Sequence, residues 1–201
     1  MGLIYSLYND TRTVFRLKDV AMITGETNFN SLNMKLNYYV RTGSLQNPRK
    51  GIYCKHNYNL QELACRIFTP VYISLEYVLQ QAGVIFQYDS RLTAISYLSR
   101  EIEIDGKIFS FRKMKDEILV SSQGIEQRGN TLTIATPERA FLDMLYLNGV
   151  MYFDNLNSLR IDLIEQILPV TRYLLPFTVH PLLENLRYSL GVSLYFSLKR
   201  R

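Results

Sequence analysis

Apolar residues in the first 43 positions recur at the three- and four-residue intervals that are typical of amphipathic helices. They predict three helices, which cover residues 3–8, 16–24 and 29–43. Gly25 ends the second helix, and only the short polar segment 26–28 separates it from the third. This spacing predicts a helix-turn-helix, in which the third helix is the candidate recognition helix.

Two strand-like segments follow the third helix, at residues 44–46 and 51–55. The turn Asn47-Pro48-Arg49-Lys50 joins them, because Asn and Pro favour turns. A hairpin directly after a helix-turn-helix predicts a winged helix-turn-helix.

A short helix over residues 60–68 ends before Pro70, which we interpret as the linker between two domains. The sequence therefore predicts a DNA-binding domain at residues 1–69 and a second, α/β domain at residues 70–201. The second domain begins with an expected helix over residues 73–83, with Ser74 as its cap and Gly83 as its stop.

Alternating patterns then predict strands at residues 92–99, 100–104, 107–111, 124–128 and 131–135. Asp105-Gly106 and Gly129-Asn130 are the expected hairpin turns. A helix follows from Thr136, and the tail over residues 161–198 is mostly helical by pattern. The fold class is therefore α+β: a winged helix-turn-helix followed by antiparallel strands packed with helices.

The positive charge of the chain lies in its first third. Residues 1–70 hold nine Lys and Arg against four Asp and Glu, and residues 71–201 hold fourteen of each, so the whole net charge of +5 belongs to the first segment. A basic module of this kind favours a nucleic-acid partner. No apolar run reaches the roughly 18 to 20 residues of a membrane span, and no secretion pattern opens the chain, so we expect a cytoplasmic protein without a membrane partner.

The polar face of the third helix carries the candidate base-reading residues. At about 100° per residue this face collects Asn30, Met34, Asn37, Tyr38 and Arg41, with Ser31 and Asn33 beside it. Asn is a poor helix former, but its amide pairs with the adenine edge in the major groove, while Arg contacts guanine or phosphate. We expect the hairpin cations Arg49 and Lys50, with Lys55, to contact the phosphate backbone of double-stranded DNA.

The chain has little that suggests catalysis or a cofactor. Cys54 and Cys65 are its only cysteines, and with His56 and His180 they lack the spacing of a zinc site, so we interpret them as reduced core residues. The sequence has no nucleophile elbow and no phosphate-binding glycine loop. We therefore expect no enzyme, no metal and no cofactor.

Several segments resemble the AbiEi family, the antitoxins of type IV toxin-antitoxin systems linked to abortive phage infection. They are KGIYCK at residues 50–55, YISLE at residues 72–76 and ATPERAFLDMLYL at residues 135–147. The resemblance covers nearly the whole chain and depends on the order and spacing of these short segments.

The resemblance implies a function in phage defence. Members of this family bind inverted repeats in their own promoter through a winged helix-turn-helix and repress their operon. Their second domain counteracts a nucleotidyltransferase-like toxin without a stable toxin-antitoxin complex, so the resemblance leaves direct contact with the toxin open. Many relatives extend further than this chain, which ends soon after Leu198 in Lys199-Arg200-Arg201.

The segment at residues 135–147 has a structural interpretation of its own. Thr136 caps a helix, Pro137 fits its first turn, and Glu138 suits the positive end of the helix dipole. Arg139 and Asp143 form an i,i+4 pair. These five residues are thus structural, with contact to a partner as the alternative.

Three alternative functions stay open. The winged helix could bind protein, which would make the chain a non-enzymatic adaptor, or it could hold structured RNA by its phosphates. Asp89, Asp105 and Lys107 also resemble the carboxylates and lysine of a metal-dependent nuclease. Asp105-Gly106 predicts a hairpin turn. This argues against the nuclease, because a nuclease needs its lysine inside a strand beside the carboxylate.

Overall fold

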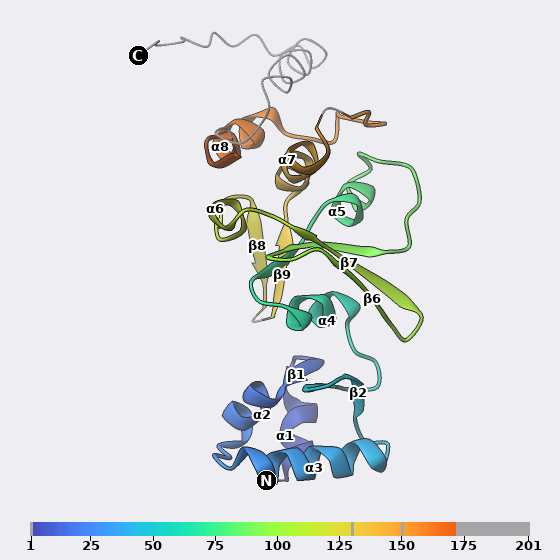
Figure 1. Ribbon diagram of the computed structural model, residues 1–201, viewed down its shortest axis with the longest axis vertical. Coiled ribbons are helices and arrows are strands. Elements are labelled where there is room, and N and C mark those ends of the chain that lie inside the picture. The colour runs from blue at the N-terminus through green and yellow to red at the C-terminus, as the bar shows by residue number, and fades with distance from the viewer. Residues whose placement is uncertain (1, 130, 150, 172–201) are drawn as a thin grey trace.

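The structure is a computed structural model that describes residues 2–129, 131–149 and 151–171. An N-terminal lobe and a larger lobe built on a second sheet stack along the long axis, with helix α4 (Leu60–Ile67) between them (Figure 1). Position 130 of the expected turn, and the expected tail beyond residue 171 with its basic end Lys199-Arg200-Arg201, lie outside the described residues.

The N-terminal lobe combines three helices with a three-stranded antiparallel sheet of order β1-β3-β2. Its elements are α1 (Leu3–Asn9), β1 (Val14–Arg16), α2 (Leu17–Thr24), α3 (Phe29–Arg41), β2 (Gln46–Arg49) and β3 (Ile52–Cys54). All three predicted helices are confirmed, and Gly25 ends α2 in the left-handed conformation, with a φ of 69°. The core of the lobe consists of Leu7, Phe15, Val20, Leu32, Leu36, Leu45 and Tyr53.

The hairpin differs from the sequence prediction. Asn47, Pro48 and Arg49 belong to β2, and the turn is Lys50-Gly51, where Gly51 has a φ of +79°. Pro48 fits a strand here because β2 is at the edge of the sheet and its register shifts between Gln46 and Arg49. The sequence pattern did not predict β1, which has only three residues.

Helix α4 joins the two lobes. It packs against β1 on one side and against strands of the larger sheet on the other. Its buried Leu63, Ala64 and Cys65 belong to one apolar cluster that includes Val14 and Ile52 from the first sheet and most of the buried residues of the larger lobe. The two lobes therefore share a continuous core.

Glu62 of α4 adds a polar link between the lobes. Its Oε2 accepts the backbone N–H of Thr13 at 2.8 Å, and its Oε1 accepts the hydroxyl of Thr131 at 3.0 Å. One carboxylate thus holds the loop before β1 and the loop before β9 (Leu132–Ala135).

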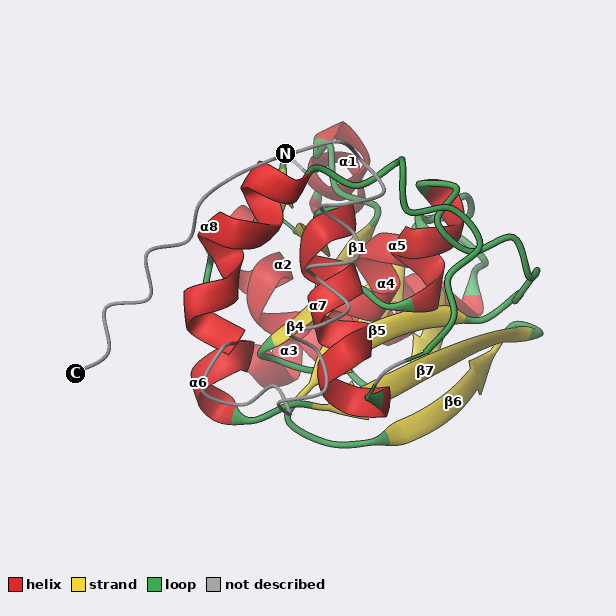
Figure 2. Ribbon diagram, turned by 90° about the horizontal axis from the view of Figure 1, so that it is seen from above, coloured by secondary structure: helices red, strands yellow, loops and turns green. Residues whose placement is uncertain are grey.

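The larger lobe has a six-stranded sheet of order β6-β7-β5-β4-β9-β8, which bears out the mixed α+β character of the chain. The remaining strands are β4 (Val71–Ile73), β5 (Leu92–Ser96), β6 (Arg100–Ile104), β7 (Lys107–Lys113) and β8 (Ile125–Arg128). The remaining helices are α5 (Glu76–Gln81), α6 (Asp116–Leu119), α7 (Pro137–Asn148) and α8 (Ile161–Thr171). Helices α5 and α7 cover the sheet face opposite α4, and α8 packs on α7 (Figures 1 and 2). None of the described helices has the length and apolar character needed to cross a membrane.

The predicted antiparallel strands account for only part of the larger sheet, which is mixed. β4 pairs with β9 in parallel, and so does β5 with β7. The hairpin at Asp105-Gly106 forms as predicted, but it places β7 beside β5 and β6 at the edge. The physical reason is that Phe109 and Phe111 of β7 are buried, whereas the charged side chains of β6 suit a solvated edge.

The expected helix over residues 73–83 begins later and lacks the predicted cap. Val71–Ile73 is instead a central strand, and α5 starts only at Glu76. Leu75 makes the turn between them with a φ of 62°, which is rare for a residue with a side chain. Ser74 is buried, and its hydroxyl donates to Asp143 at 2.8 Å instead of capping the helix.

A buried ionic network ties α7 to the sheet. Arg139 Nε donates to Asp143 Oδ1 at 3.0 Å, and both side chains are fully buried. Tyr72 in β4 donates to Asp143 Oδ2 at 3.0 Å, beside the hydroxyl of Ser74. Arg139 also donates to the carbonyls of Ile118 and Gln123, so its charge is neutralised and its donors are used.

Both cysteines are buried and reduced. Burial raises the pKa of the Cys54 thiol to about 12 and also raises the pKa of Cys65. Both thiols therefore stay protonated at neutral pH and act as small apolar residues of the core.

Arg139→Met should destabilise the fold by about 3 to 5 kcal/mol, because it leaves the Asp143 carboxylate buried without its counter-charge. Urea unfolding followed by circular dichroism measures this effect. Arg128→Met is the matched control, since Arg128 pairs with Glu126 on the exposed strand β8 and should contribute little. Equal stabilities of the two variants would contradict a supporting role of the buried pair.

Candidate nucleic-acid interface

Helix α3 is fixed at its start and along its inner side. The side chain of Asn28 caps it by accepting the N–H of Ser31 at 3.0 Å. Leu32 and Leu36 face the core of the N-terminal lobe and are fully buried. The helix forms one end of the molecule, on the far side from the six-stranded sheet (Figure 1). Its outer side therefore faces solvent.

The outer face of α3 consists of Asn30, Met34, Asn37, Tyr38 and Arg41, all exposed. Met34 is 68% and Tyr38 54% exposed, which is unusual for large apolar side chains in a helix that has a core to pack on. The helix thus presents amide, guanidinium and apolar contact groups together. This is the combination that suits base edges and thymine methyl groups in a major groove.

Two of the predicted contact residues have structural partners. Asn33 Oδ1 accepts the hydroxyl of Tyr53 at 2.8 Å, which ties α3 to β3. Burial raises the pKa of Tyr53, so its hydroxyl stays a donor. Ser31 is half-buried and donates its backbone N–H to the Asn28 cap. Both residues flank the outer face, and Asn33 keeps its amide N–H groups for another contact.

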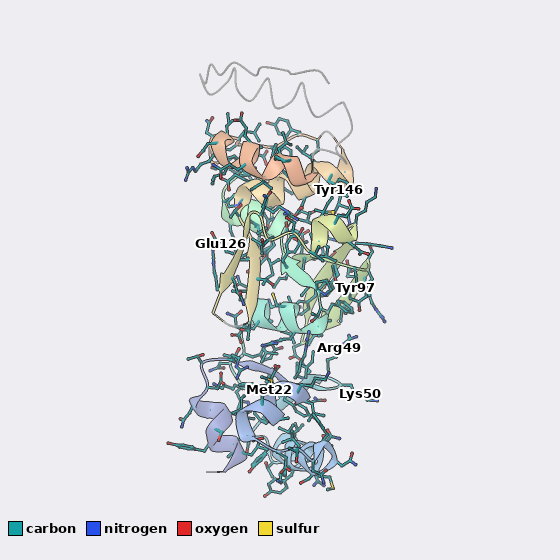
Figure 3. The ribbon with its side chains drawn as sticks, turned by 90° about the vertical axis from the view of Figure 1, so that its left-hand side faces the viewer. Met22, Arg49, Lys50, Tyr97, Glu126 and Tyr146 are labelled. Atoms are coloured by element: carbon teal, nitrogen blue, oxygen red, sulfur yellow. The ribbon has the colours of Figure 1, made fainter. Side chains whose placement is uncertain are left out.

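The hairpin tip does not project as a free flap. Arg49 lies 6.0 Å from the ring centroid of Phe68, just after α4. Figure 3 shows Arg49 and Lys50 at the level where the N-terminal lobe meets α4. Lys50 is exposed at the turn. The structure therefore places these two cations beside α4, and not in line with the outer face of α3.

Arg49 and Lys50 border a hollow of about 390 Å³ that is rich in positive charge. This basic hollow is lined by the cations Arg16, Lys18, Arg49, Lys50 and Arg66, together with Leu17, Phe29, Gly51, Ile52 and Ile67. The one carboxylate paired with these cations is Asp19, 3.6 Å from Arg66, within the part of the chain that the structure describes. Phe29 is the first residue of α3, so the basic hollow adjoins the start of that helix.

Arg16 links the lining of the basic hollow to the end of α4 through hydrogen bonds. Its guanidinium donates to the carbonyls of Arg66 and Phe68, at 2.8 and 3.1 Å. Burial lowers the pKa of Arg16, and the charge of Arg66 acts in the same direction. The buried Nε of Arg66 has no acceptor among the described residues. An anion bound in the hollow would offset the repulsion between the two guanidinium groups.

Lys55, which is predicted to contact phosphate, has hydrogen-bond partners within the N-terminal lobe. Its Nζ donates to the carbonyls of Tyr8 and Asp10 at 3.3 and 2.6 Å, at the C-terminal end of α1. It also lies about 6 Å from the rings of Tyr8 and Phe15. The structure thus places Lys55 as a link between β3 and α1, and it does not line the basic hollow.

Both carboxylates of the nuclease alternative have a hydrogen-bond or ion-pair partner within the fold. Asp89 forms an ion pair with Arg91 at 2.6 Å, and Asp105 accepts the hydroxyl of Tyr58 at 2.6 Å in the turn after β6. No group of three His, Cys, Asp or Glu residues that could hold a metal occurs in residues 2–129, 131–149 and 151–171.

The residues at the start of α7 organise the larger lobe. Thr136 caps the helix by accepting the N–H of Arg139 at 3.3 Å, and Pro137 occupies its first turn. Glu138 is buried and accepts the N–H of Arg160, which directs the chain into α8. Together with the ionic network of Arg139 and Asp143, these contacts give the five predicted residues a structural role in the larger lobe.

Sequence reasoning missed Arg16, Lys18 and Arg66 as members of the candidate interface. Each is an isolated cation in the sequence, and Arg66 belongs to a helix 50 residues after Arg16. The pairing of β1 with β3 places Arg16 opposite Ile52 of the hairpin, and the packing of α4 against the N-terminal lobe adds Arg66. The adjacent pair Arg49-Lys50 was the one local signal for this site.

Comparison with known proteins identifies no family for this chain. No model of a protein family matches it, and no curated protein is significantly similar to it. The resemblance to AbiEi antitoxins therefore stays a prediction that depends on three short segments.

Lys55→Ala should lower the free energy of unfolding by about 1 to 2 kcal/mol, because two carbonyls at the end of α1 lose a charged donor. Lys50→Ala, five positions earlier on the exposed turn, should change it by less than about 0.5 kcal/mol. Urea unfolding of both variants measures the difference. A lower free energy of unfolding for Lys50→Ala, with no change for Lys55→Ala, would contradict the structural role of Lys55.

Proposed function

We propose that this chain binds duplex DNA through a winged helix-turn-helix. In this proposal α2 and α3 are the helix-turn-helix, and the hairpin of β2 and β3 is a short wing. Helix α3 enters the major groove with its outer face. The single observation that carries the proposal is this exposed face of asparagines with Arg41, on a helix whose start adjoins a basic hollow.

Asparagine and arginine on the outer face supply sequence preference. Asn30 and Asn37 lie two helical turns apart, so they can reach different base pairs. Each bidentate pair with a base contributes about 1 to 3 kcal/mol of discrimination. The exposed Met34 lies between them and suits a thymine methyl group.

The basic hollow supplies affinity without sequence preference. Five cations around one open hollow match the phosphates of a backbone strand that leaves the groove at the start of α3. Each neutralised phosphate releases counterions, so binding through the hollow depends steeply on salt.

We further propose that the chain represses its own operon and acts in the cytoplasm as the antitoxin of a type IV toxin-antitoxin system. This part is supported by the resemblance of residues 50–55, 72–76 and 135–147 to AbiEi antitoxins. The second domain would counteract a nucleotidyltransferase-like toxin encoded beside it, and the first would bind inverted repeats in the shared promoter.

DNA binding is tested by fluorescence anisotropy with a labelled duplex from the region upstream of the gene and a scrambled duplex of equal composition. Arg41→Ala should weaken operator binding about tenfold, and Asn37→Ala should reduce the preference for the operator. The double variant Arg49→Ala/Lys50→Ala should weaken binding to both duplexes and reduce the salt slope by about two.

The matched control is Lys107→Ala/Lys113→Ala, which removes two exposed cations from β7 in the other lobe. Its affinity and salt slope should equal those of the unchanged protein. Equal affinity of the unchanged protein for operator and scrambled duplex would refute sequence-specific repression.

Antitoxicity is tested by co-expression with the product of the neighbouring reading frame. Growth that this product arrests should be restored by the full chain. Arg41→Ala should restore growth equally well when expressed from an unrelated promoter, because its substitution lies in the N-terminal lobe. Continued arrest in the presence of folded protein would contradict the antitoxin role and leave DNA binding unaffected.

A further inference from the structure

A second hollow, of about 570 Å³, lies in the larger lobe, away from the DNA-binding face. It is formed between the loop after α5 and the loop after α7, which extend on the same side of the molecule (Figures 1 and 2). We call it the tyrosine hollow; its lining comprises Glu76, Gln80, Ile85, Gln87, Tyr88, Asp89, Arg91, Met144, Asn148, Met151, Tyr152 and Asp154.

Hydrogen bonds fix the two loops against each other. Asp154 Oδ2 accepts the N–H of Phe86 at 2.7 Å, and the N–H of Asp154 donates to the carbonyl of Val84 at 3.1 Å. Gln80 Nε2 donates to the carbonyl of Gln87 and holds the first loop to α5. The hollow is therefore a built feature of the fold.

Tyr88 and Tyr152 line the hollow and are highly exposed, as is Phe86, which lies between two lining residues in the sequence. Tyr88 is 86%, Tyr152 82% and Phe86 69% exposed. The hydroxyls of Tyr88 and Tyr152 make no hydrogen bond within residues 2–129, 131–149 and 151–171. Exposed aromatic side chains beside a hollow are typical of contact surfaces, where the faces of their rings pack against a ligand.

The tyrosine hollow carries net negative charge. Arg91 is its one cation, and Asp89 neutralises it through a bidentate ion pair. Arg91 also lies 3.6 Å from Glu101, outside the hollow. Two further carboxylates, Glu76 and Asp154, form no ion pair among the described residues, although the negative charge of Glu76, after the hydrogen bond to Asp89, contributes to the raised pKa of Arg91.

Several acceptor atoms remain available in the hollow, beside the hydroxyls of Tyr88 and Tyr152 and the side-chain amide of Gln87. The Glu76 carboxylate makes no hydrogen bond or ion pair in the described part of the chain, and Asp154 uses only Oδ2. Gln80 uses its amide nitrogen on Gln87, so its carbonyl oxygen remains. Acceptors and aromatic faces together suit a planar, cationic donor, and the guanidinium group has five N–H donors and stacks on aromatic rings.

We propose that the tyrosine hollow binds an arginine side chain on a segment of a partner protein. The guanidinium lies against Tyr88 and Tyr152 and donates to Glu76, Asp154 and Gln80. This site is separate from the DNA-binding face, so it gives the larger lobe a protein contact of its own. Whether the tyrosine hollow binds arginine does not depend on whether the N-terminal lobe binds DNA.

The experiment uses the full chain with 3-fluorotyrosine and the peptide acetyl-Gly-Arg-Gly-amide as the probe. Fluorine NMR resolves the tyrosines, and Tyr88→Phe and Tyr152→Phe assign their two signals. Both signals should shift during the titration, while that of Tyr5, exposed on α1, should not. The same peptide with citrulline in place of arginine has nearly the same shape without the charge, and it should bind at least about tenfold more weakly.

Glu76→Gln should weaken binding of the arginine peptide about tenfold, because it removes the unpaired carboxylate. Glu103→Gln, on the exposed edge strand β6, is the matched control and should leave binding unchanged. Equal binding of the citrulline peptide, an unchanged affinity of Glu76→Gln, or the absence of shifts would overturn the proposal. Shifts caused by adenosine and not by the arginine peptide would also overturn it, in favour of a nucleobase.

Discussion

The packing of α4 between two sheets is the constraint on which the rest of the structure depends. Leu63, Ala64 and Cys65 lie in a core to which both sheets contribute, and Glu62 bonds to a threonine from each lobe. This packing fixes the N-terminal lobe against the larger one. It directs the outer face of α3 away from the rest of the protein and brings Arg66 to the hairpin tip. The candidate interface is thus a product of how the lobes meet.

Features that depend on neighbouring residues could be predicted from the sequence. Gly25 ends α2, Asp105-Gly106 makes the hairpin turn, and Thr136 caps α7, because each of these signals acts within one turn of the chain. The outer face of α3 follows from helical periodicity alone. Once Leu32 and Leu36 are recognised as the buried side of the helix, the periodicity gives the residues of the opposite, exposed side.

Features that depend on distant contacts could not be predicted in this way. The apolar pattern predicts a helix from Ile73 onward. Ile73 is instead the last residue of β4, because β5 and β9 pair with this strand on both sides. Ser74 leaves the capping position for a buried carboxylate that lies 69 residues further along the chain. Lys55 looks like a surface cation beside a hairpin until the fold brings α1 to it. The basic hollow belongs to the same class, because its cations come from β1, α2, the hairpin and α4.

In the proposed DNA complex, the outer face of α3 contacts base pairs. NMR of the full chain with ¹⁵N-labelled asparagine tests it most directly, because the side-chain amides of Asn30 and Asn37 report on their own surroundings. On addition of duplex from the upstream region, the account predicts that these two signals shift strongly, while that of Asn148 on α7 does not. Binding of the duplex with unchanged Asn30 and Asn37 signals would contradict the account.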